Sequence, residues 1–240
     1  MQAVILSAGQ GRRLLPLTAD RPKCLIDLHG KTLLQWQLDA LLEAGIGPIT
    51  VVTGYASEAV EAVLAKHYSR QPVRVQFNPF FQVADNLGSC WIAREAFSDQ
   101  LLLLNGDTVF EPAVVARVLG APATTIRLTI DRKAQYDDDD MKVIVDGERL
   151  LRIGKHLPAD AVDAESIGML RFSADGARHF QHAVELALRE PDGLRWWYLS
   201  VIDRLADQNL VSTCSIEGLR WAEVDFPRDL DAARAVVMQV

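Results

Sequence analysis

In the first half of the chain, short apolar segments alternate with segments of helical periodicity. Residues 3–6 and 101–105 are apolar runs of the kind that form strands buried on both faces of a sheet. Between these runs, the predicted strands and helices follow one another, with strands at about 48–53 and 73–77 and helices at about 32–44, 57–67 and 86–96. This order predicts an α/β fold: a Rossmann-like, doubly wound, mostly parallel sheet whose ligand crevice lies at the carboxyl ends of the strands.

The second half of the chain is richer in strand signals. Its predicted strands, two of which form a hairpin around Asp146-Gly147, lie at 124–131, 141–145, 150–153 and 166–172. They are followed by helices at 173–189 and 196–207, a closing pair of strands at 211–216 and 221–224, and a C-terminal helix from about 227. We find no repeat or linker and expect one domain over 1–240, with a first half at about 1–120, a second half at about 121–226 that carries a small β-rich insertion, and the helix at about 227–240.

Composition excludes several classes of protein. Charged residues make up 24% and hydrophobic residues 49% of the chain, as in ordinary globular proteins, and the net charge of −7 argues against a nucleic-acid binder. No apolar stretch approaches the length of a membrane span, and the first residues enter a strand rather than a signal peptide. The three cysteines lack metal-ligand spacing and are expected to be reduced, as in a cytoplasmic protein.

The first strand leads directly into a loop suited to phosphate. Gly9 and Gly11 let backbone N–H groups approach an anion closely, and Arg12 and Arg13 add guanidinium groups that can bind phosphate oxygens in pairs. Lys23 adds a further positive charge from the next loop. The glycine spacing differs from that of a Walker A loop and from that of a dinucleotide-binding turn.

These loops carry a family resemblance. The run Ser7-Ala-Gly-Gln-Gly-Arg-Arg-Leu14, followed by Pro22-Lys23-Cys24-Leu25, resembles the signature of the nucleotidylyltransferases that join nucleoside triphosphates to sugar phosphates or alcohol phosphates, with Ser7 in place of the usual alanine. The resemblance implies a nucleotide-diphospho-sugar transferase type of fold. It also implies attack of an acceptor phosphate on the α-phosphorus while pyrophosphate leaves. Arg13 and the Gly9–Gly11 amides would hold the pyrophosphate, and Lys23 would stabilise charge at the α-phosphate.

Two aspartates are the predicted metal ligands. Asp107 follows the apolar run at 101–105, where the crevice opens, and carboxylate oxygen there suits Mg²⁺. In the resembling family this aspartate and an acidic residue near the C-terminal strand hold the metal together, and Asp225 matches the second position. Glu223 lies on the same face of an extended strand, and we expect it to turn toward substrate. The four acids at 137–140 are expected to form a solvated loop.

The nucleotide is expected to lie between the end of the first strand and the loop at 85–89. Its predicted binding residues are Leu6, Ala8, Gly9, Gly11, Arg12, Asn86, Gly88 and Ser89. Asn86 and Ser89 can form hydrogen bonds with a pyrimidine edge or ribose, although the same segment also suits the start of a helix. The choice of base rests on the resemblance, because polar side chains alone do not separate cytosine from uracil.

The later segments resemble the branch that activates phosphocholine and related small amino- or polyol-phosphates with CTP. The segments concerned are 136–143 and 163–169, and motifs typical of sugar-phosphate enzymes are missing. The predicted acceptor residues are Lys142, Glu165, Trp197, Trp221 and Glu223. Aromatic faces with a carboxylate suit a quaternary ammonium, through cation–π attraction of about 0.5–2 kcal/mol per ring. The same tryptophans also fit a helical core pattern.

The sequence therefore favours a Mg²⁺-dependent cytidylyltransferase that acts on CTP, or another nucleoside triphosphate, and a small phosphorylated alcohol such as phosphocholine. One alternative is a nucleotidylyltransferase for a sugar-1-phosphate or an inositol phosphate. A second is a non-catalytic nucleotide-sensing subunit, which the presence of Arg13, Lys23, Asp107 and Asp225 disfavours. No nucleic acid or membrane partner is expected, and the oligomeric state is left open, a homo-oligomer included.

Overall fold

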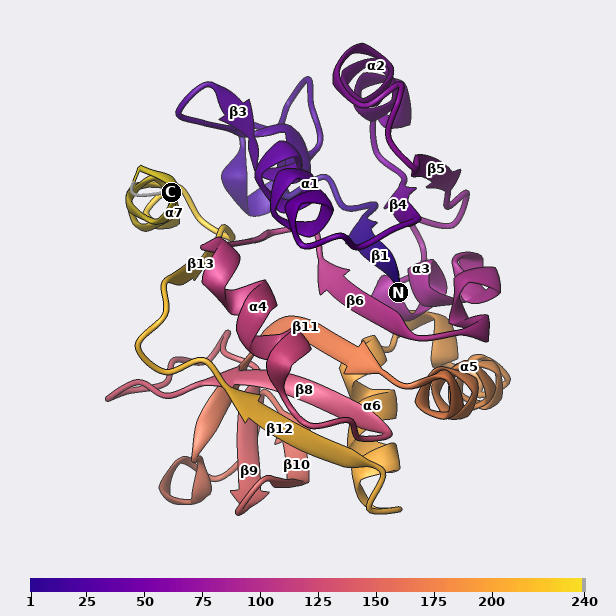
Figure 1. Cartoon of the computed structure of the whole chain (residues 1–240), viewed down its shortest axis with the longest axis vertical. Helices are drawn as coiled ribbons and strands as arrows, with labels where there is room; N and C mark the ends of the chain where they lie inside the picture. The colour runs from indigo at the N-terminus through magenta and orange to yellow at the C-terminus, as the bar shows by residue number, and fades with distance from the viewer. Residues whose placement is uncertain (239–240) are drawn as a thin grey trace.

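The structure, a computed structural model, describes residues 1–238 and forms three layers, with helices on both faces of one large sheet (Figure 1). The strand order is β5 (Val73–Phe77), β4 (Ile49–Thr53), β1 (Gln2–Ser7), β6 (Leu101–Asn105), β11 (Ala164–Phe172), β8 (Ile126–Asp131), β12 (Val211–Ser215), β10 (Arg149–Gly154) and β9 (Lys142–Asp146). The predicted strands of the first half and the predicted hairpin are confirmed.

The expectation of a mostly parallel sheet is wrong, because the main sheet is mixed. The first four strands of the order run parallel, but β11 is antiparallel to both β6 and β8, and β9 and β10 are antiparallel to each other. The physical reason is the connections: parallel neighbours need a long crossover, usually a helix, and β9, β10 and β11 follow one another without an α-helix between them.

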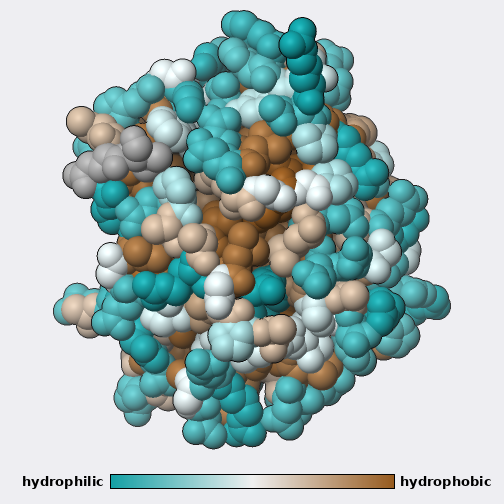
Figure 2. Space-filling model, in the orientation of Figure 1, coloured by the Kyte–Doolittle hydropathy of each residue, from teal (hydrophilic) through white to brown (hydrophobic). Residues whose placement is uncertain are grey.

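Alternate residues of the strands face the two helical layers. One layer consists of α1 (Leu33–Glu43), α2 (Ser57–His67) and α4 (Pro112–Gly120), which pack on residues such as Ile5 and Leu104. The other consists of α3 (Asn86–Ile92), α5 (Ala174–Leu188) and α6 (Tyr198–Ala206), which pack on residues such as Val4 and Leu103. Figure 2 shows a mostly hydrophilic surface, crossed by a hydrophobic band where α1 and α4 lie in Figure 1.

Short 3-10 helices occur at Arg12–Leu14, Lys23–Leu25, Arg94–Ser98, Ala159–Ala161 and Gly193–Arg195. The predicted helix at 86–96 thus ends at Ile92 and continues as a 3-10 segment. Within residues 1–238, no helix combines the length and apolar character needed to cross a membrane. The division of the chain at about 120 and 226 stays a prediction.

A small two-stranded sheet brings the C-terminal segment to the edge of the large one. β13 (Trp221–Glu223) pairs antiparallel with β7 (Thr108–Phe110), so the predicted pairing of 221–224 with 211–216 is wrong. The strand at 211–215 instead runs parallel to β8 inside the main sheet. α7 (Asp229–Val237) packs on this small sheet together with Leu14 and with β2 (Asp27–Leu28), which pairs with β3 (Lys31–Thr32). The predicted C-terminal helix is confirmed over this range, and residues 239–240 lie outside the described residues.

Candidate active site

A cavity of about 280 Å³ opens where β1 and β6 end side by side. Because the two strands are parallel neighbours, their carboxyl ends meet at one edge of the sheet. Predicted site residues that line this cavity are Leu6, Ala8, Gly9, Asn86, Ser89 and Asp107. Gly11, Arg12 and Gly88 are not among its lining residues, and Gly88 lines a separate groove beside Phe80 and Trp91. Six of the predicted site residues therefore line one cavity, and Gly11, Arg12 and Gly88 lie outside its lining.

Two glycines allow the chain to close around this site. A Cβ on Gly106 would collide with Ser7 Oγ and Leu6 O, so only glycine lets the end of β6 approach the end of β1. Gly11 has φ of 73°, and a Cβ there would lie 2.9 Å from Cβ of Lys23. A side chain at either position would push apart segments that carry functional groups.

Three carboxylates meet beside the cavity. Oxygen atoms of Asp107, Glu223 and Asp225 lie within 4.8 Å of one another. The β7–β13 pairing brings them together, because Glu223 pairs with Thr108 and the Val224 N–H donates to Asp107 O at 3.0 Å. Asp107 and Asp225 are the predicted metal ligands and Glu223 the residue predicted to face substrate, and in the structure all three belong to one cluster.

Two cations compensate this negative charge. Lys23 Nζ lies 2.8 Å from Asp107 Oδ2 and contacts Asp225 Oδ1, and Arg13 Nη1 lies 3.2 Å from Asp225 Oδ2. Burial alone would lower the pKa of Lys23, but the charges of Asp107 and Asp225 outweigh it and raise that pKa above its usual range. Burial likewise opposes ionisation of Asp225, and attraction by Lys23 and then Arg13 holds its pKa below the ordinary value.

The acidic cluster has the chemistry of a site for a hard divalent cation. Asp107 Oδ1 is buried and has no hydrogen-bond partner within residues 1–238, which leaves a carboxylate lone pair for a ligand. Desolvation by its neighbours, and then repulsion from Asp107 and Asp225, raises the pKa of Glu223 to about 8. A cation bound here would give the buried Asp107 oxygen a partner and would reduce the repulsion that raises the pKa of Glu223. Carboxylate oxygens are the ligands that Mg²⁺ prefers.

Two of the predicted acceptor residues, Glu165 in β11 and Lys142 in β9, are engaged with other protein groups. Glu165 is buried in β11, and its Oε2 lies 2.9 Å from Lys133 Nζ. Burial raises the pKa of Glu165 to about 7, against the opposing effect of Lys133. The ammonium of Lys142 donates to backbone carbonyls of Asp137 and Lys155. Their predicted contacts with an acceptor stay predictions.

The two tryptophans differ in their surroundings. Trp221 Nε1 donates to Asp131 Oδ2 at 2.8 Å, and the ring packs partly buried against the apolar core to which α4 contributes. The ammonium of Lys155 lies over the Trp197 ring, and its Nζ is 4.9 Å from the ring centroid. Lys155 was missed by sequence reasoning, because no local pattern marks its contact with a distant aromatic ring.

The acidic run at 137–140 is a loop, as expected, but its carboxylates have specific partners. Asp139 Oδ1 lies 3.4 Å from Lys155 Nζ and 3.5 Å from Arg13 Nη1. Asp140 Oδ2 lies 2.7 Å from Lys133 Nζ. The loop therefore connects Arg13, a predicted phosphate-binding cation of the first half, to Lys155 and Lys133 of the second half. These ion pairs join distant segments, which the sequence does not reveal.

Polar residues beneath the cavity form a network that sequence reasoning also missed. The hydroxyl of Tyr198, a fully buried residue, donates to Asn105 Oδ1 at 3.0 Å, and its backbone N–H donates to Asn86 Oδ1 at 2.8 Å. Asn78 Nδ2 donates to Ser89 Oγ at 3.1 Å. The only sequence signal was the polar character of these residues beside predicted strand ends.

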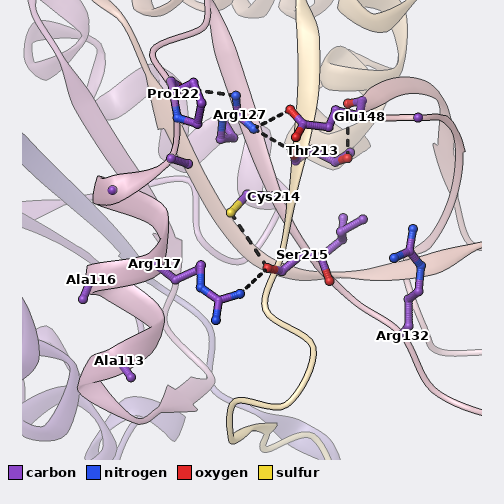
Figure 3. A pocket seen from close by; sticks show the side chains of 14 residues that line it. Ala113, Ala116, Arg117, Pro122, Arg127, Arg132, Glu148, Thr213, Cys214 and Ser215 are labelled. Carbon is purple, nitrogen blue, oxygen red and sulfur yellow. Dashed lines mark hydrogen bonds and ion pairs between the residues drawn. The ribbon is translucent and has the colours of Figure 1, made fainter.

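A second cavity, of about 810 Å³, lies between α4, β12 and the β9–β10 turn (Figure 3) and includes none of the predicted site residues. Arg127 donates to Thr213 O at 2.7 Å and to Glu148 Oε2 at 3.2 Å, and Arg117 donates to Ser215 O at 3.3 Å. These contacts are drawn in Figure 3. Because both guanidinium groups bond to the protein itself, they hold strand, helix and turn together.

Comparison with known proteins identifies similar chains. Residues 3–159 match the model of the MobA-like NTP transferase domain. The chain is 30% identical to the CMP-5'-(3-aminopropyl)phosphonate synthase of Streptomyces rubellomurinus, over 95% of this chain but only 37% of that protein's length. It is 26% identical to the CTP:phosphoglutamine cytidylyltransferase of Campylobacter jejuni, over 96% of this chain and 98% of that one. The fold is similar to the solved CTP:phosphocholine cytidylyltransferase of Streptococcus pneumoniae, with a TM-score of 0.79, 20% identity and 98% of each chain covered.

Proposed function

The chain belongs to the family of MobA-like NTP transferase domains, and from that premise we propose that it transfers a cytidylyl group from CTP to a small phosphate or phosphonate that carries an amine. The reaction would require Mg²⁺ and release pyrophosphate. The observation that carries the proposal is the cluster of Asp107, Glu223 and Asp225 beside Lys23 and Arg13, at the mouth of the cavity between β1 and β6.

In this proposal the chain's own residues neutralise charge and position the reactants. Asp107 and Asp225, with Glu223 beside them, would hold Mg²⁺, which when bound would neutralise charge on the phosphate oxygens. Lys23 would turn from the carboxylates toward the α-phosphate, and Arg13, with the Gly9 amide, would hold the pyrophosphate. No protein nucleophile is needed, because an ionised acceptor phosphate attacks directly. Each such donor typically contributes about a hundredfold to a thousandfold in rate.

The choice of CTP is supported by the two relatives named above, one of which makes a CMP-linked product while the other uses CTP. Leu6, Ala8, Asn86 and Ser89 line the part of the cavity where the base would lie. The position of Gly11 beside the Lys23 stem supports its role in shaping the phosphate loop. Arg12 is exposed, and Gly88 faces another groove, so we assign both only supporting roles.

An acceptor amine would be recognised chiefly by carboxylates. Trp197 is already covered by the Lys155 ammonium, and the Trp221 ring packs against the apolar core, so neither ring offers a free face without rearrangement. Glu223 belongs to the acidic cluster and keeps part of its side chain exposed, and Glu165 lies buried with Lys133. This favours an acceptor with a primary amine, for which carboxylates are hydrogen-bond acceptors, over a quaternary ammonium.

The proposal is tested by measuring pyrophosphate release with Mg²⁺ across a grid of substrates. CTP, UTP, GTP and ATP are each combined with phosphocholine, aminoethyl phosphonate, inositol 1-phosphate and glucose 1-phosphate. We expect turnover with CTP and an amine-bearing acceptor, and loss of about a hundredfold or more in Asp107→Asn. Turnover only with a sugar or inositol phosphate would refute the acceptor assignment. Nucleotide binding without any turnover would refute the proposed activity altogether.

A further inference from the structure

We propose that Asn78, a residue outside the predicted site, makes the cavity select cytosine over uracil by fixing the direction in which the Ser89 hydroxyl donates. The inference rests on the proposed binding of a pyrimidine nucleotide in this cavity and adds the residue that decides between two bases of the same shape. Asn78 would act through Ser89, and is therefore a positioning residue rather than a catalytic one.

The orientation of the Asn78 amide is set by the backbone. Asn78 directly follows β5 and is 1% exposed, and its own N–H donates to Thr53 O at 2.8 Å. Its side-chain Oδ1 accepts from the Phe80 N–H at 2.9 Å. Because a backbone N–H can only donate, the oxygen must face Phe80, which leaves the NH₂ group toward Ser89.

The Ser89 hydroxyl is consequently left as a donor. Ser89 is 3% exposed and lines the cavity, and one lone pair of its Oγ accepts from Asn78 Nδ2 at 3.1 Å. No acceptor for the hydroxyl hydrogen is found among the residues that the structure describes. A hydroxyl carries one hydrogen, so the group presents that hydrogen, and one remaining lone pair, to a ligand.

Asn86 presents a second donor on the same side of α3. It precedes Ser89 by three residues, and residues at this spacing lie on one face of a helix. Its Oδ1 already accepts from the Tyr198 N–H at 2.8 Å, so its NH₂ group is the part left to a ligand in the cavity. Ser89 and Asn86 together therefore offer two neighbouring donors.

Two neighbouring donors match cytosine. Cytosine carries adjacent acceptors at N3 and O2, whereas uracil has an N–H at N3. If uracil bound, the Ser89 oxygen could accept from that N–H, but the Ser89 hydrogen would then be buried without an acceptor. A mismatch of this kind weakens binding by about tenfold to a hundredfold, so the ratio of the two dissociation constants should favour CTP by that factor.

The decisive variant is Asn78→Asp, which keeps the shape of the side chain and reverses the hydrogen bond. One carboxylate oxygen would still accept from Phe80 N–H, and the other would accept the Ser89 hydrogen, so that Ser89 offers only lone pairs to the ligand. Dissociation constants for CTP and UTP are measured by calorimetry with Mg²⁺ and no acceptor, at about pH 8, roughly four units above the ordinary pKa of an aspartate carboxyl. We expect the preference to reverse toward UTP, which a merely structural role of Asn78 would not produce.

Matched variants separate the hydrogen-bond direction from general damage. Ser89→Ala is expected to bring the two dissociation constants within about threefold of each other, and Asn78→Asp added to Ser89→Ala should leave their ratio unchanged. With 3-deaza-CTP, which has C–H in place of N3, the unmodified protein should lose about tenfold in affinity and Ser89→Ala should lose none. This comparison tests the inference even if Asn78→Asp fails to fold.

A folded Asn78→Asp that still prefers CTP, or a Ser89→Ala with the original preference, would overturn the inference. The proposed function is judged separately, by turnover of the unmodified protein with CTP, and would stand in both cases. Binding of purine nucleotides alone would instead refute the proposed function, and the inference with it.

Discussion

Replacing Lys23 by methionine tests whether charge compensation holds the acidic cluster together. Methionine preserves the apolar stem on which Gly11 packs, and removes only the ammonium that contacts Asp107 and Asp225. Breaking a buried ion pair typically destabilises a protein by about 3–5 kcal/mol. The two aspartate side chains keep 24% and 28% exposure, so solvent screening reduces the effect, and we expect a loss of about 2–3 kcal/mol in the free energy of unfolding.

The assay is denaturant and thermal unfolding in the absence and presence of Mg²⁺. Without the metal, the melting temperature of Lys23→Met should fall by about 5–10 °C. With the metal, the variant should recover more stability than the unmodified protein, because the cation no longer competes with an ammonium for the same carboxylates. Turnover should remain lower by about a hundredfold or more, since Mg²⁺ would not replace the ammonium proposed to meet the α-phosphate.

The destabilisation should depend on pH in a defined direction. Attraction by Lys23 holds the pKa of Asp225 below its ordinary value of 3.8, so the stability that this carboxylate adds is present above about pH 4 and disappears as the pH falls through its folded-state pKa. The difference between Lys23→Met and the unmodified protein should therefore shrink in acid.

A matched control is Lys31→Met, which breaks an ion pair with Asp39 of nearly equal length, 2.7 Å, on the surface, where the Lys31 side chain is 45% exposed. It should change stability by about 0.5 kcal/mol or less and leave the response to Mg²⁺ unchanged. Equal stability of Lys23→Met and the unmodified protein near neutral pH, with the same response to Mg²⁺, would refute the reasoning.

Three further outcomes follow from individual contacts. Asp107→Asn should keep the fold but abolish the stabilisation by Mg²⁺ in a thermal-shift assay, because it removes the charge of a carboxylate whose second oxygen is buried without a partner. Burial raises the pKa of Glu165 from 4.5 to about 7, so the folded state should lose stability as the pH rises between these values. Glu165→Gln should remove this slope and be more stable by about 1–2 kcal/mol in urea unfolding at about pH 8. Arg171→Met should cost about 1–3 kcal/mol without changing the KM for CTP, because the Arg171 guanidinium donates to three carbonyls at the end of α4, far along β11 from Glu165.

The first half of the chain was predictable because its signals are local. β1, β4, β5 and β6 are short apolar or alternating runs, and α1 begins at Thr32 with a capping box that involves Gln35. Parallel order then follows from the intervening helices, which supply the crossovers that parallel neighbours need. The cavity at the ends of β1 and β6 was predictable for the same reason.

The second half was predictable in its elements but not in their pairing. Strand signals at 166–172 and 221–224 identified β11 and β13, yet nothing local indicates that β11 runs antiparallel beside β6, or that β13 pairs with β7. A short connection made the hairpin of 211–216 with 221–224 the natural expectation. In the structure, β12 is instead an inner strand of the main sheet, and β13 pairs with β7. The ion pair between Glu111, which follows β7, and Arg220, which precedes β13, joins the ends of these two strands.

That unexpected pairing is what builds the acidic cluster. Because β13 pairs with β7 directly after Asp107, Glu223 and Asp225 are carried to the edge where β6 ends. Asp229, the first residue of α7, accepts from the N–H groups of Asp225 and Phe226, so the C-terminal helix fixes the last carboxylate. Ionised carboxylates gathered in this way repel one another, which is part of why the pKa of Glu223 is raised, and the cations that compensate the two aspartates come from the N-terminal loops. The groups proposed to meet the phosphates therefore also join the first and last segments of the chain before any substrate binds.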